Sequence, residues 1–186
     1  MPLLEGMALV NIVRTEIVTE EDTPQTYVFE TADEATVEPH ISEGQENILR
    51  VKNQILAIDR TEDIVVGYDL TFKNNTLIPE LLALIDGGTL TYDEVDTTKV
   101  IKYEGPESGK TVSRTKFTLN VYTEEKDESG DTVKYAKFTF KHCKGKPVGF
   151  SLKDGQFYVP ELKAESRPKS GEKPVIIEFL DELPSL

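Results

Sequence analysis

Few residues in this chain are of the types that carry out chemistry. The two histidines, His40 and His142, lie far apart in the sequence, and Cys143 is the single cysteine. Metal sites in proteins need several His, Cys or carboxylate ligands, so each histidine is expected to be a lone polar residue. Cys143 follows His142 directly, and neighbours on a strand point to opposite faces. The two are therefore not expected to form a nucleophile–base pair, and the thiol is expected to fill space in the core.

The carboxylates do not form a recognisable site either. Glu20-Glu21-Asp22 and Glu124-Glu125 lack the spacing of a calcium-binding EF-hand loop. No G-x-S-x-G, G-x-x-x-x-G-K-[ST] or G-x-G-x-x-G motif occurs. The acidic clusters are therefore expected to be solvated turns. The sequence predicts no enzyme, no cofactor and no metal.

Charge and length narrow the class of protein further. The chain has 186 residues with 34 acidic and 21 basic side chains, a formal net charge of −13. Such a surface repels nucleic acid. A single cysteine gives no internal disulfide. The N-terminus does not have the pattern of a signal peptide, and no apolar run reaches the ~18 residues of a membrane span, so no membrane insertion is expected.

The charges are also unevenly distributed. Residues 1–49 hold eleven acidic side chains and one basic side chain, whereas residues 132–153 hold six lysines and no acid. Two interpretations remain open. Each segment could form a solvated face, or the two could form complementary surfaces that meet between subunits.

Alternating apolar and polar residues predict that most of the chain forms strands. In residues 133–142, alternation places Phe138 and Phe140 on one face and Lys137 and Lys141 on the other. Residues 31–44 are acidic and are expected to be rich in loops, and the last strand is expected to be buried. The expected strands are residues 9–13, 27–29, 47–53, 64–72, 112–123, 133–142, 156–165 and 175–180.

One short helix is predicted at about residues 79–86. Pro79 suits the first turn, where its missing N–H costs nothing, and Gly87-Gly88 ends the helix. Asn74, Asn75 or Thr76 is expected to cap its start. Because two turns are too short to be stable alone, its apolar side chains must pack on a sheet. These packing residues are Leu81, Leu82, Leu84 and Ile85.

These elements together predict a mainly β fold, a two-sheet β-sandwich or partial barrel with one short α-helix. Residues 47–186 are expected to form this domain. Residues 1–46 are expected to be an N-terminal arm or peripheral strands. A chain of this length is expected to bury one core.

The segment from Gly67 to Gly88 resembles the tail tube (major tail) proteins of long-tailed bacteriophages. A strand, Gly67-Tyr68-Asp69-Leu70-Thr71-Phe72, is followed by Pro79-Glu80-Leu81-Leu82-Ala83-Leu84-Ile85 and then by Asp86-Gly87-Gly88. The similarity covers about residues 47–92 best and agrees with the order of strands to the end of the chain. Residues 1–46 match no part of that family.

The resemblance implies a structural, non-enzymatic protein of the virion tail that is assembled in the host cytoplasm. Such subunits form hexameric rings, in which an inner sheet of each joins an intersubunit β-barrel, and the rings stack into a conduit through which genome DNA is ejected. The implied partners are other copies of the chain, the tape measure protein, the tail terminator and the baseplate or distal tail proteins. Double-stranded DNA passes without specific binding. The sequence does not distinguish a non-contractile tail from a contractile one, which adds a sheath protein.

Alternate polar positions on the long strands are candidates to face an aqueous lumen. Lys137 and Lys141 would be awkward there unless neighbouring acids neutralise them, which favours a place at a subunit boundary or against a second sheet. The charged segment after the first of these strands is a candidate for contacts between rings. The candidate lumen-facing residues are Ser113, Thr115, Thr118, Asn120, Glu124 and Thr139, and the candidate inter-ring loop is Glu125, Lys126, Asp127, Glu128, Ser129 and Gly130.

Two other classes of protein stay open. A monomeric β-sandwich that binds a small ligand or a carbohydrate would use pocket aromatics such as Tyr68, Tyr135 and Tyr158. An enzyme on a β scaffold would need paired catalytic groups, which the sequence does not present. Size distinguishes the first two classes, because a tube protein forms rings or polymers and a ligand-binding module does not.

Overall fold

The computed structural model describes residues 6–29 and 32–185 of the chain. In these residues the chain forms twelve strands and one short helix, so the predicted mainly β fold is confirmed. Every strand pairing is antiparallel. In chain order the elements are β1 (Leu9–Thr19), β2 (Thr26–Phe29), β3 (Ala32–Ser42), β4 (Glu46–Val51), β5 (Gln54–Arg60), β6 (Ile64–Asn74), α1 (Pro79–Asp86), β7 (Thr89–Tyr92), β8 (Val100–Glu104), β9 (Phe117–Lys126), β10 (Thr132–Gly145), β11 (Glu161–Ser166) and β12 (Ile176–Leu180).

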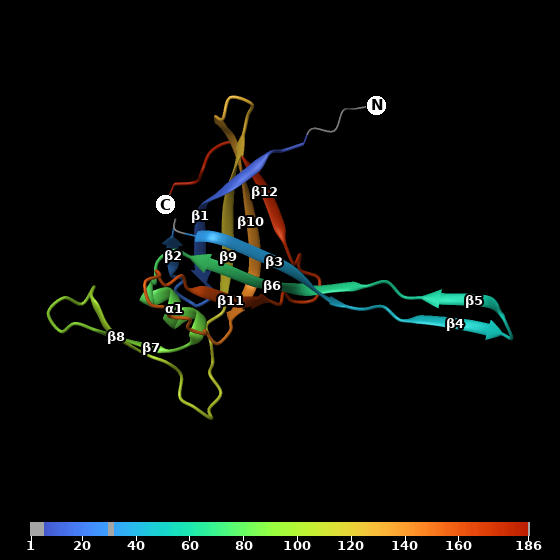
Figure 1. Cartoon of the computed structure of the whole chain (residues 1–186), viewed down its shortest axis with the longest axis horizontal. Coiled ribbons are helices and arrows are strands. Elements are labelled where there is room, and N and C mark those ends of the chain that lie inside the picture. Colours follow the sequence, from blue (N-terminus) through green and yellow to red (C-terminus); the bar gives the residue numbers. More distant parts are fainter. Residues whose placement is uncertain (1–5, 30–31, 186) are drawn as a thin grey trace.

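Strand β10 joins the two layers of the fold. The large sheet has the order β2-β1-β9-β10-β11-β6-β3, and β12 also pairs with β10. Residues Tyr135–Thr139 of β10 pair with β12, whereas Cys143–Gly145 pair with β11. Between them, His142 has a φ of 53° and the register with β9 shifts. Such a bulge bends a strand. One layer therefore contains β2, β1, β9, β10 and β12, and the other contains β11, β6 and β3 (Figure 1).

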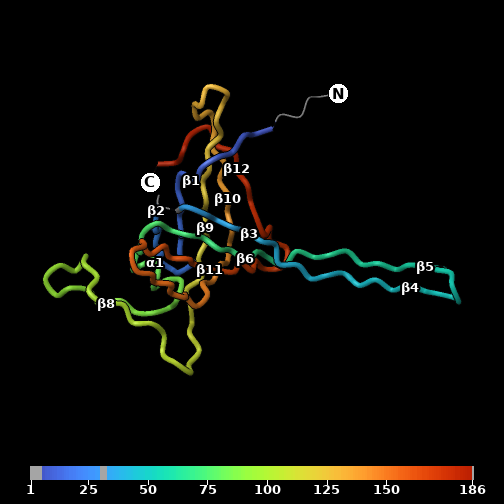
Figure 2. The backbone as a smooth tube through the Cα atoms, in the orientation of Figure 1, coloured from blue at the N-terminus to red at the C-terminus, as the bar shows by residue number. Residues whose placement is uncertain are grey.

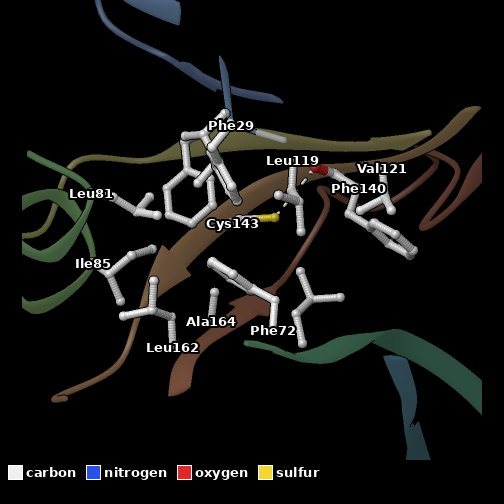
Figure 3. Packing of buried hydrophobic residues seen from close by; sticks show 13 residues of the cluster. Phe29, Phe72, Leu81, Ile85, Leu119, Val121, Phe140, Cys143, Leu162 and Ala164 are labelled. Carbon is white, nitrogen blue, oxygen red and sulfur yellow. Dashed lines mark hydrogen bonds between the residues drawn. The ribbon is translucent and has the colours of Figure 1, made fainter. Parts of the chain in front are cut away.

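The two layers face each other across one hydrophobic core (Figure 3). Phe117 and Phe140 of the first layer and Phe72 of the second are buried, and the ring of Phe72 lies 6.4 Å from that of Phe29. The sheet bends on itself without closing into a barrel in the described residues, which agrees with the predicted sandwich. The described members of the core cluster are Ile17, Phe29, Leu70, Phe72, Leu81, Ile85, Phe117, Leu119, Val121, Phe140, Cys143, Leu162 and Ala164.

Helix α1 covers one end of this core. The helix has Pro79 in its first turn, and Gly87 ends it in a left-handed conformation with its N–H bonded to the carbonyl of Ala83, as predicted. The predicted caps Asn74, Asn75 and Thr76 are wrong, because the N-cap is Ile78 and makes no side-chain capping hydrogen bond. Packing therefore fixes the start of the helix. Of its apolar side chains, Leu81, Leu82 and Ile85 are buried and Leu84 is half-buried.

Several boundaries differ from the prediction. The predicted loop-rich segment 31–44 is wrong over its described residues, because β3 occupies Ala32–Ser42, and residue 31 lies outside the described residues. The predicted strands at 112–123 and 156–165 begin later, at Phe117 and Glu161. The last strand is not buried, since Ile177 and Phe179 are 46% and 62% exposed. Residues 9–42 contribute β1, β2 and β3 to the large sheet.

Two hairpins project from the sandwich. Strands β4 and β5 form one two-stranded ribbon, and β7 and β8 form another. Figure 2 shows both running away from the body of the molecule, the β4–β5 ribbon as the longer of the two. We call β4, β5 and the turn between them (residues 46–60) the arm.

Candidate functional site

The face of the β2-β1-β9-β10-β12 layer that points away from the core carries polar side chains, of which Arg14, Asn120, Tyr122 and Thr139 are buried. Residues that lie opposite each other on paired strands share a face. Asn120 lies opposite Glu16 on one side and Thr139 on the other. Tyr122 likewise lies between Arg14 and Lys137. We call this surface the polar face.

Hydrogen bonds order the polar face into one network. Glu16 is its centre, because its carboxylate accepts hydrogen bonds from Asn120 Nδ2 at 3.3 Å and from Tyr122 OH at 2.9 Å, and pairs with Arg14 Nε at 2.9 Å. Thr139 Oγ1 donates to Asn120 Oδ1 at 2.9 Å. The Arg14 guanidinium lies 4.5 Å from the centre of the Tyr122 ring. Burial and the bond to Glu16 raise the pKa of Tyr122, so this hydroxyl stays a donor.

Four of the six candidate lumen-facing residues lie on the polar face. Thr118, Asn120 and Glu124 alternate along β9, and Thr139 lies opposite Asn120 on β10. Ser113 and Thr115 do not lie in a strand, because β9 begins only at Phe117. Thr115 donates a hydrogen bond to Glu21 at 3.1 Å, and Ser113 lies beside the glycines that follow α1.

Of the two lysines that would be awkward in a lumen, Lys137 and Lys141, only Lys137 is paired within the described residues. Lys137 Nζ lies 3.3 Å from the carboxylate of Glu178, the residue opposite it on β12. Arg14 is held by Glu16 and also donates to the carbonyl of Pro184 at 2.7 Å. Arg14 and Lys137 therefore each have an anionic partner within the chain, whereas Lys141 of β10 is exposed.

Glu124 joins β1, β9 and β10 at one end of the polar face. Its carboxylate accepts hydrogen bonds from Thr132 Oγ1 and Asn11 Nδ2, each at 2.6 Å, and lies 3.2 Å from Lys126 Nζ. The bonds from Thr132 and Asn11, with the charge of Lys126, lower the pKa of Glu124 from 4.5 to about 2.

This depressed pKa predicts how stability depends on pH. The contacts of Glu124 stabilise the fold above pH 4.5, and their contribution disappears as the pH falls towards 2. We expect Glu124→Gln to lower the free energy of unfolding by about 1 kcal/mol at pH 7, because solvent screens the pair, and to have little effect near pH 2. Urea unfolding at both pH values measures this difference. Glu128→Gln in the exposed turn is the control, and an equal loss at both pH values would contradict the assignment.

The candidate inter-ring loop is shorter than predicted. Glu125 and Lys126 belong to β9, so only the segment from Asp127 onwards forms a turn. Asp127 Oδ1 accepts hydrogen bonds from the N–H groups of Ser129 and Asp131, each at 2.9 Å. The turn is thus an ordered projection at the end of the β9–β10 hairpin.

The histidines lie in two separate ion-pair clusters. His142 contacts Glu20 through Nδ1 at 2.6 Å and Glu172 through Nε2 at 2.9 Å. His40 lies 3.4 Å from Asp69. Burial raises the pKa of the Cys143 thiol to about 12, which leaves it protonated and unreactive. Among residues 6–29 and 32–185, no group of three or more His, Cys, Asp and Glu side chains is placed to hold a metal ion.

The arm exposes apolar side chains that sequence reasoning did not single out. Every residue from Glu46 to Arg60 is exposed. The sequence pattern that could have predicted the arm is a pair of apolar runs on either side of Lys52-Asn53. These two residues form a hairpin turn, in which Lys52 has a φ of 52°. The exposed apolar residues of the arm are Ile48, Leu49, Val51, Ile55, Leu56 and Ile58.

An apolar cleft of about 370 Å³ opens between the two layers. One wall comes from β3 and β6, and the other comes from β1, β9, β10, β12 and Val175 just before β12. Tyr68 lines it, whereas Tyr135 and Tyr158, the other two aromatics considered for a ligand pocket, do not. The lining residues are Ile12, Ala35, Val37, Tyr68, Val121, Thr123, Phe138, Phe140, Val175 and Ile177.

Comparison with known proteins gives similarity to solved structures. No family model matches the chain, and no curated protein matches it. Among solved structures, a chain of the six-fold symmetrised cryo-EM structure of the anti-feeding prophage (AFP) baseplate is similar over 97% of both chains, with 11% sequence identity and a TM-score of 0.39. A TM-score this low supports no inference about function. None of the helices in the described residues is long and apolar enough to cross a membrane.

Proposed function

We propose that this chain is a structural, non-catalytic subunit of a phage tail tube, which assembles with copies of itself into stacked hexameric rings around a conduit for DNA. The observation that carries the proposal is the polar face, a layer of hydrogen-bonded polar side chains on a sheet that has two edges left to pair, although Arg14, Asn120, Tyr122 and Thr139 are only 2–8% exposed in the isolated chain. Within the described residues, β2 ends this layer on one side and β12 flanks β10 on the other. The resemblance of residues 47–92 to tail tube proteins adds to it.

Edge strands favour association because their outer N–H and C=O groups are unpaired. Strands β2 and β12 have four and five residues, so they match in length. Pairing β12 of one copy with β2 of the next would continue the sheet, and repeating this pairing around a ring would close it into a barrel without edges. The polar face would then line the lumen, because the opposite face of the layer is packed on the core.

The charges of the polar face suit a wall that DNA passes without binding. Proteins hold DNA mainly through free Lys and Arg side chains that neutralise phosphates and release counterions. On the central strands of the polar face, Arg14 and Lys137 are already paired with Glu16 and Glu178. The net charge of −13 adds long-range repulsion. In this proposal the tape measure, tail terminator and baseplate or distal tail proteins, with a sheath protein in a contractile tail, contact the tube in the virion.

The apolar cleft favours a second candidate function, binding of a small ligand by a monomer. Ligand pockets are typically apolar and about 300–1,000 Å³ in volume, and the cleft of about 370 Å³ falls in this range. Its walls are mostly aliphatic and aromatic, so an apolar ligand fits it better than a carbohydrate. A stable monomer at all concentrations would favour this function over the tube.

Electron microscopy with selective labelling tests the tube proposal. We expect purified protein at high concentration to form hollow tubes or six-fold rings in negative stain. In these assemblies a cysteine placed at Thr118, on the polar face, should react with a small maleimide but resist a large polyethylene-glycol maleimide. The control is Val95→Cys on the β7–β8 hairpin, where Val95 is 97% exposed and should react with both. Monomers at every concentration, or tubes in which Thr118→Cys reacts with both reagents, would contradict the proposal.

A further inference from the structure

The side chain of His142 contacts a carboxylate through each of its two ring nitrogens. Nδ1 lies 2.6 Å from Glu20 Oε2, and Nε2 lies 2.9 Å from Glu172 Oε2. The three residues belong to different segments, because Glu20 follows β1, His142 lies on β10, and Glu172 lies between β11 and β12. We call these three residues the His142 cluster, and residues 167–175 the β11–β12 connection.

Both contacts together need a positively charged imidazole. A neutral imidazole has one N–H group and one lone pair, whereas the imidazolium ion has two N–H groups. An ionised carboxylate accepts hydrogen bonds and cannot donate them. Both ring nitrogens of His142 lie within hydrogen-bonding distance of a carboxylate. The arrangement is therefore satisfied only while the ring carries two protons.

The two carboxylates stay ionised over the pH range in which imidazole titrates. Burial opposes the ionisation of Glu20, but hydrogen bonds from the backbone N–H and the ring of His142 and from Thr118 lower its pKa. The hydrogen bond from the Lys169 N–H and the charge of His142 lower the pKa of Glu172. Imidazole is the only side chain that ordinarily changes charge between pH 5 and 8. A change of pH in this range therefore acts on the ring of His142.

Other charged groups line a hollow of about 220 Å³ next to His142. Two of them pair with each other, since Arg167 Nη2 lies 3.4 Å from Glu165 Oε2 and also 2.8 Å from Asp69 Oδ1. The other two are lysines at exposed positions, where solvent and salt screen their charge. The ionised groups in direct contact with the imidazole are therefore the carboxylates of the His142 cluster. The charged residues around the hollow are Lys116 before β9, Lys144 of β10, Glu165 of β11 and Arg167 after β11.

Glu20 is bound more firmly to the bend of β10 than Glu172 is. The Glu20 carboxylate also accepts hydrogen bonds from the backbone N–H of His142 at 2.8 Å and from Thr118 Oγ1 at 3.0 Å. Glu172 instead accepts a hydrogen bond from the N–H of Lys169 at 2.9 Å, within its own turn. When the ring loses one proton, the remaining proton is therefore expected on Nδ1, facing Glu20. The lone pair of Nε2 then faces Glu172 and repels its carboxylate.

We infer that the His142 cluster is a pH-sensitive contact, which holds the β11–β12 connection against the bend of β10 at low pH and releases it when His142 loses a proton. The start of the connection lies against the same bend, because the N–H of Arg167 donates to the carbonyl of His142 at 3.3 Å. The connection leads directly into β12. In the proposed function β12 pairs between copies, so this edge becomes less ordered at high pH. That last consequence rests on the proposed function, whereas the cluster itself lies within one chain.

Trypsin digestion of dilute protein tests the inference without requiring assembly. Arg167 and Lys173 each precede a proline, before which trypsin does not cut, so cleavage within the connection occurs after Lys169. Glu172→Gln is the test variant, because its amide can accept a hydrogen bond from a protonated Nε2 or donate one to a bare Nε2. Its connection is therefore expected to stay bound at either pH.

The two proteins are compared at the same pH, so that the pH dependence of trypsin itself cancels. At pH 8.5 the wild-type protein is expected to be cut after Lys169 about fivefold faster than Glu172→Gln. At pH 6 the two are expected to be cut at equal rates. Equal rates at both pH values would overturn the inference, and so would a difference of the same size at both.

Histidine variants assign the effect to one ring. His142→Asn removes the titrating group, and asparagine tolerates the φ of 53° at this position. This variant is expected to be cut faster than Glu172→Gln at both pH values. The control is His40→Gln, since His40 lies 3.4 Å from Asp69 and outside the cluster. It is expected to behave as the wild type, and loss of the pH effect in this control would overturn the assignment to His142.

Nitrogen-15 NMR of the imidazole ring gives a readout that does not depend on cleavage. The chain has two histidines, so the spectrum of ring-labelled His40→Gln contains signals of His142 alone. The ring is expected to have protons on both nitrogens at pH 6 and on Nδ1 alone at pH 8.5. A ring that is neutral at pH 6, or protonated on Nε2 at pH 8.5, would overturn the inference. These measurements on the dilute chain leave the tube proposal to be decided by electron microscopy.

Discussion

Replacing Phe72 by alanine is expected to lower the free energy of unfolding by about 3–5 kcal/mol. Phe72 is 2% exposed and lies on β6 between Leu162 of β11 and Ala35 of β3. Its ring also stacks against Phe29 of the other layer, so it bridges the sandwich (Figure 3). Removing the ring leaves a cavity that the strands on either side cannot collapse to fill, because their hydrogen bonds fix their spacing.

Chemical denaturation at constant pH measures this effect. Phe157→Ala is the matched control, since Phe157 is 99% exposed, and it is expected to change the free energy of unfolding by less than about 0.5 kcal/mol. If Phe72→Ala lowered the free energy of unfolding by no more than this control does, the core would not be packed as described.

Gly145→Ala is expected to destabilise the fold by about 3 kcal/mol, the upper part of the range for overpacking. A Cβ on Gly145 would lie 2.0 Å from the carbonyl oxygen of Ile85, and the next nearest atoms are also backbone atoms of Ile85. Backbone cannot rotate aside as a flexible side chain can, so helix α1 would have to move away from the end of β10. That movement would pull the buried side chain of Ile85 out of the core.

Thermal unfolding and amide hydrogen exchange together test this effect. The exchange of the Gly87 N–H, which bonds to the Ala83 carbonyl at the end of α1, should become faster in Gly145→Ala. Gly149→Ala is the control, because a Cβ there would meet no atom within 4 Å. A variant as stable as the wild type would mean that α1 is not held against β10 at this point.

The elements that sequence patterns predicted are those whose signals are local. Pro79 and Gly87 mark the two ends of the helix by their own backbone preferences, without reference to the rest of the fold. Strands β6 and β10 alternate strongly because one face of each lies on the core. Alternation also placed Thr118 and Asn120 together with Glu124, and the structure puts all three on the polar face.

The features that sequence patterns missed depend on the surroundings of each segment. Strand β3 is an edge strand with acidic residues on its exposed side, so its composition resembles that of a loop. Ile177 and Phe179 look like residues of a buried strand, but the layer that would cover them ends before it reaches β12. The bulge at His142 has no local signal, because its cause is the turn of β10 from one layer into the other.

The bend of β10 from one layer into the other has a consequence for how the protein unfolds. Strand β10 carries hydrogen bonds to β9 and β12 in one layer and to β11 in the other. Neither layer can therefore separate as an independent unit, because separation would disrupt β10, which is hydrogen-bonded in both layers. Under tension applied along the chain, the two layers are expected to resist as one cooperative unit and not to unfold one after the other. The sandwich is expected to yield in a single all-or-none event.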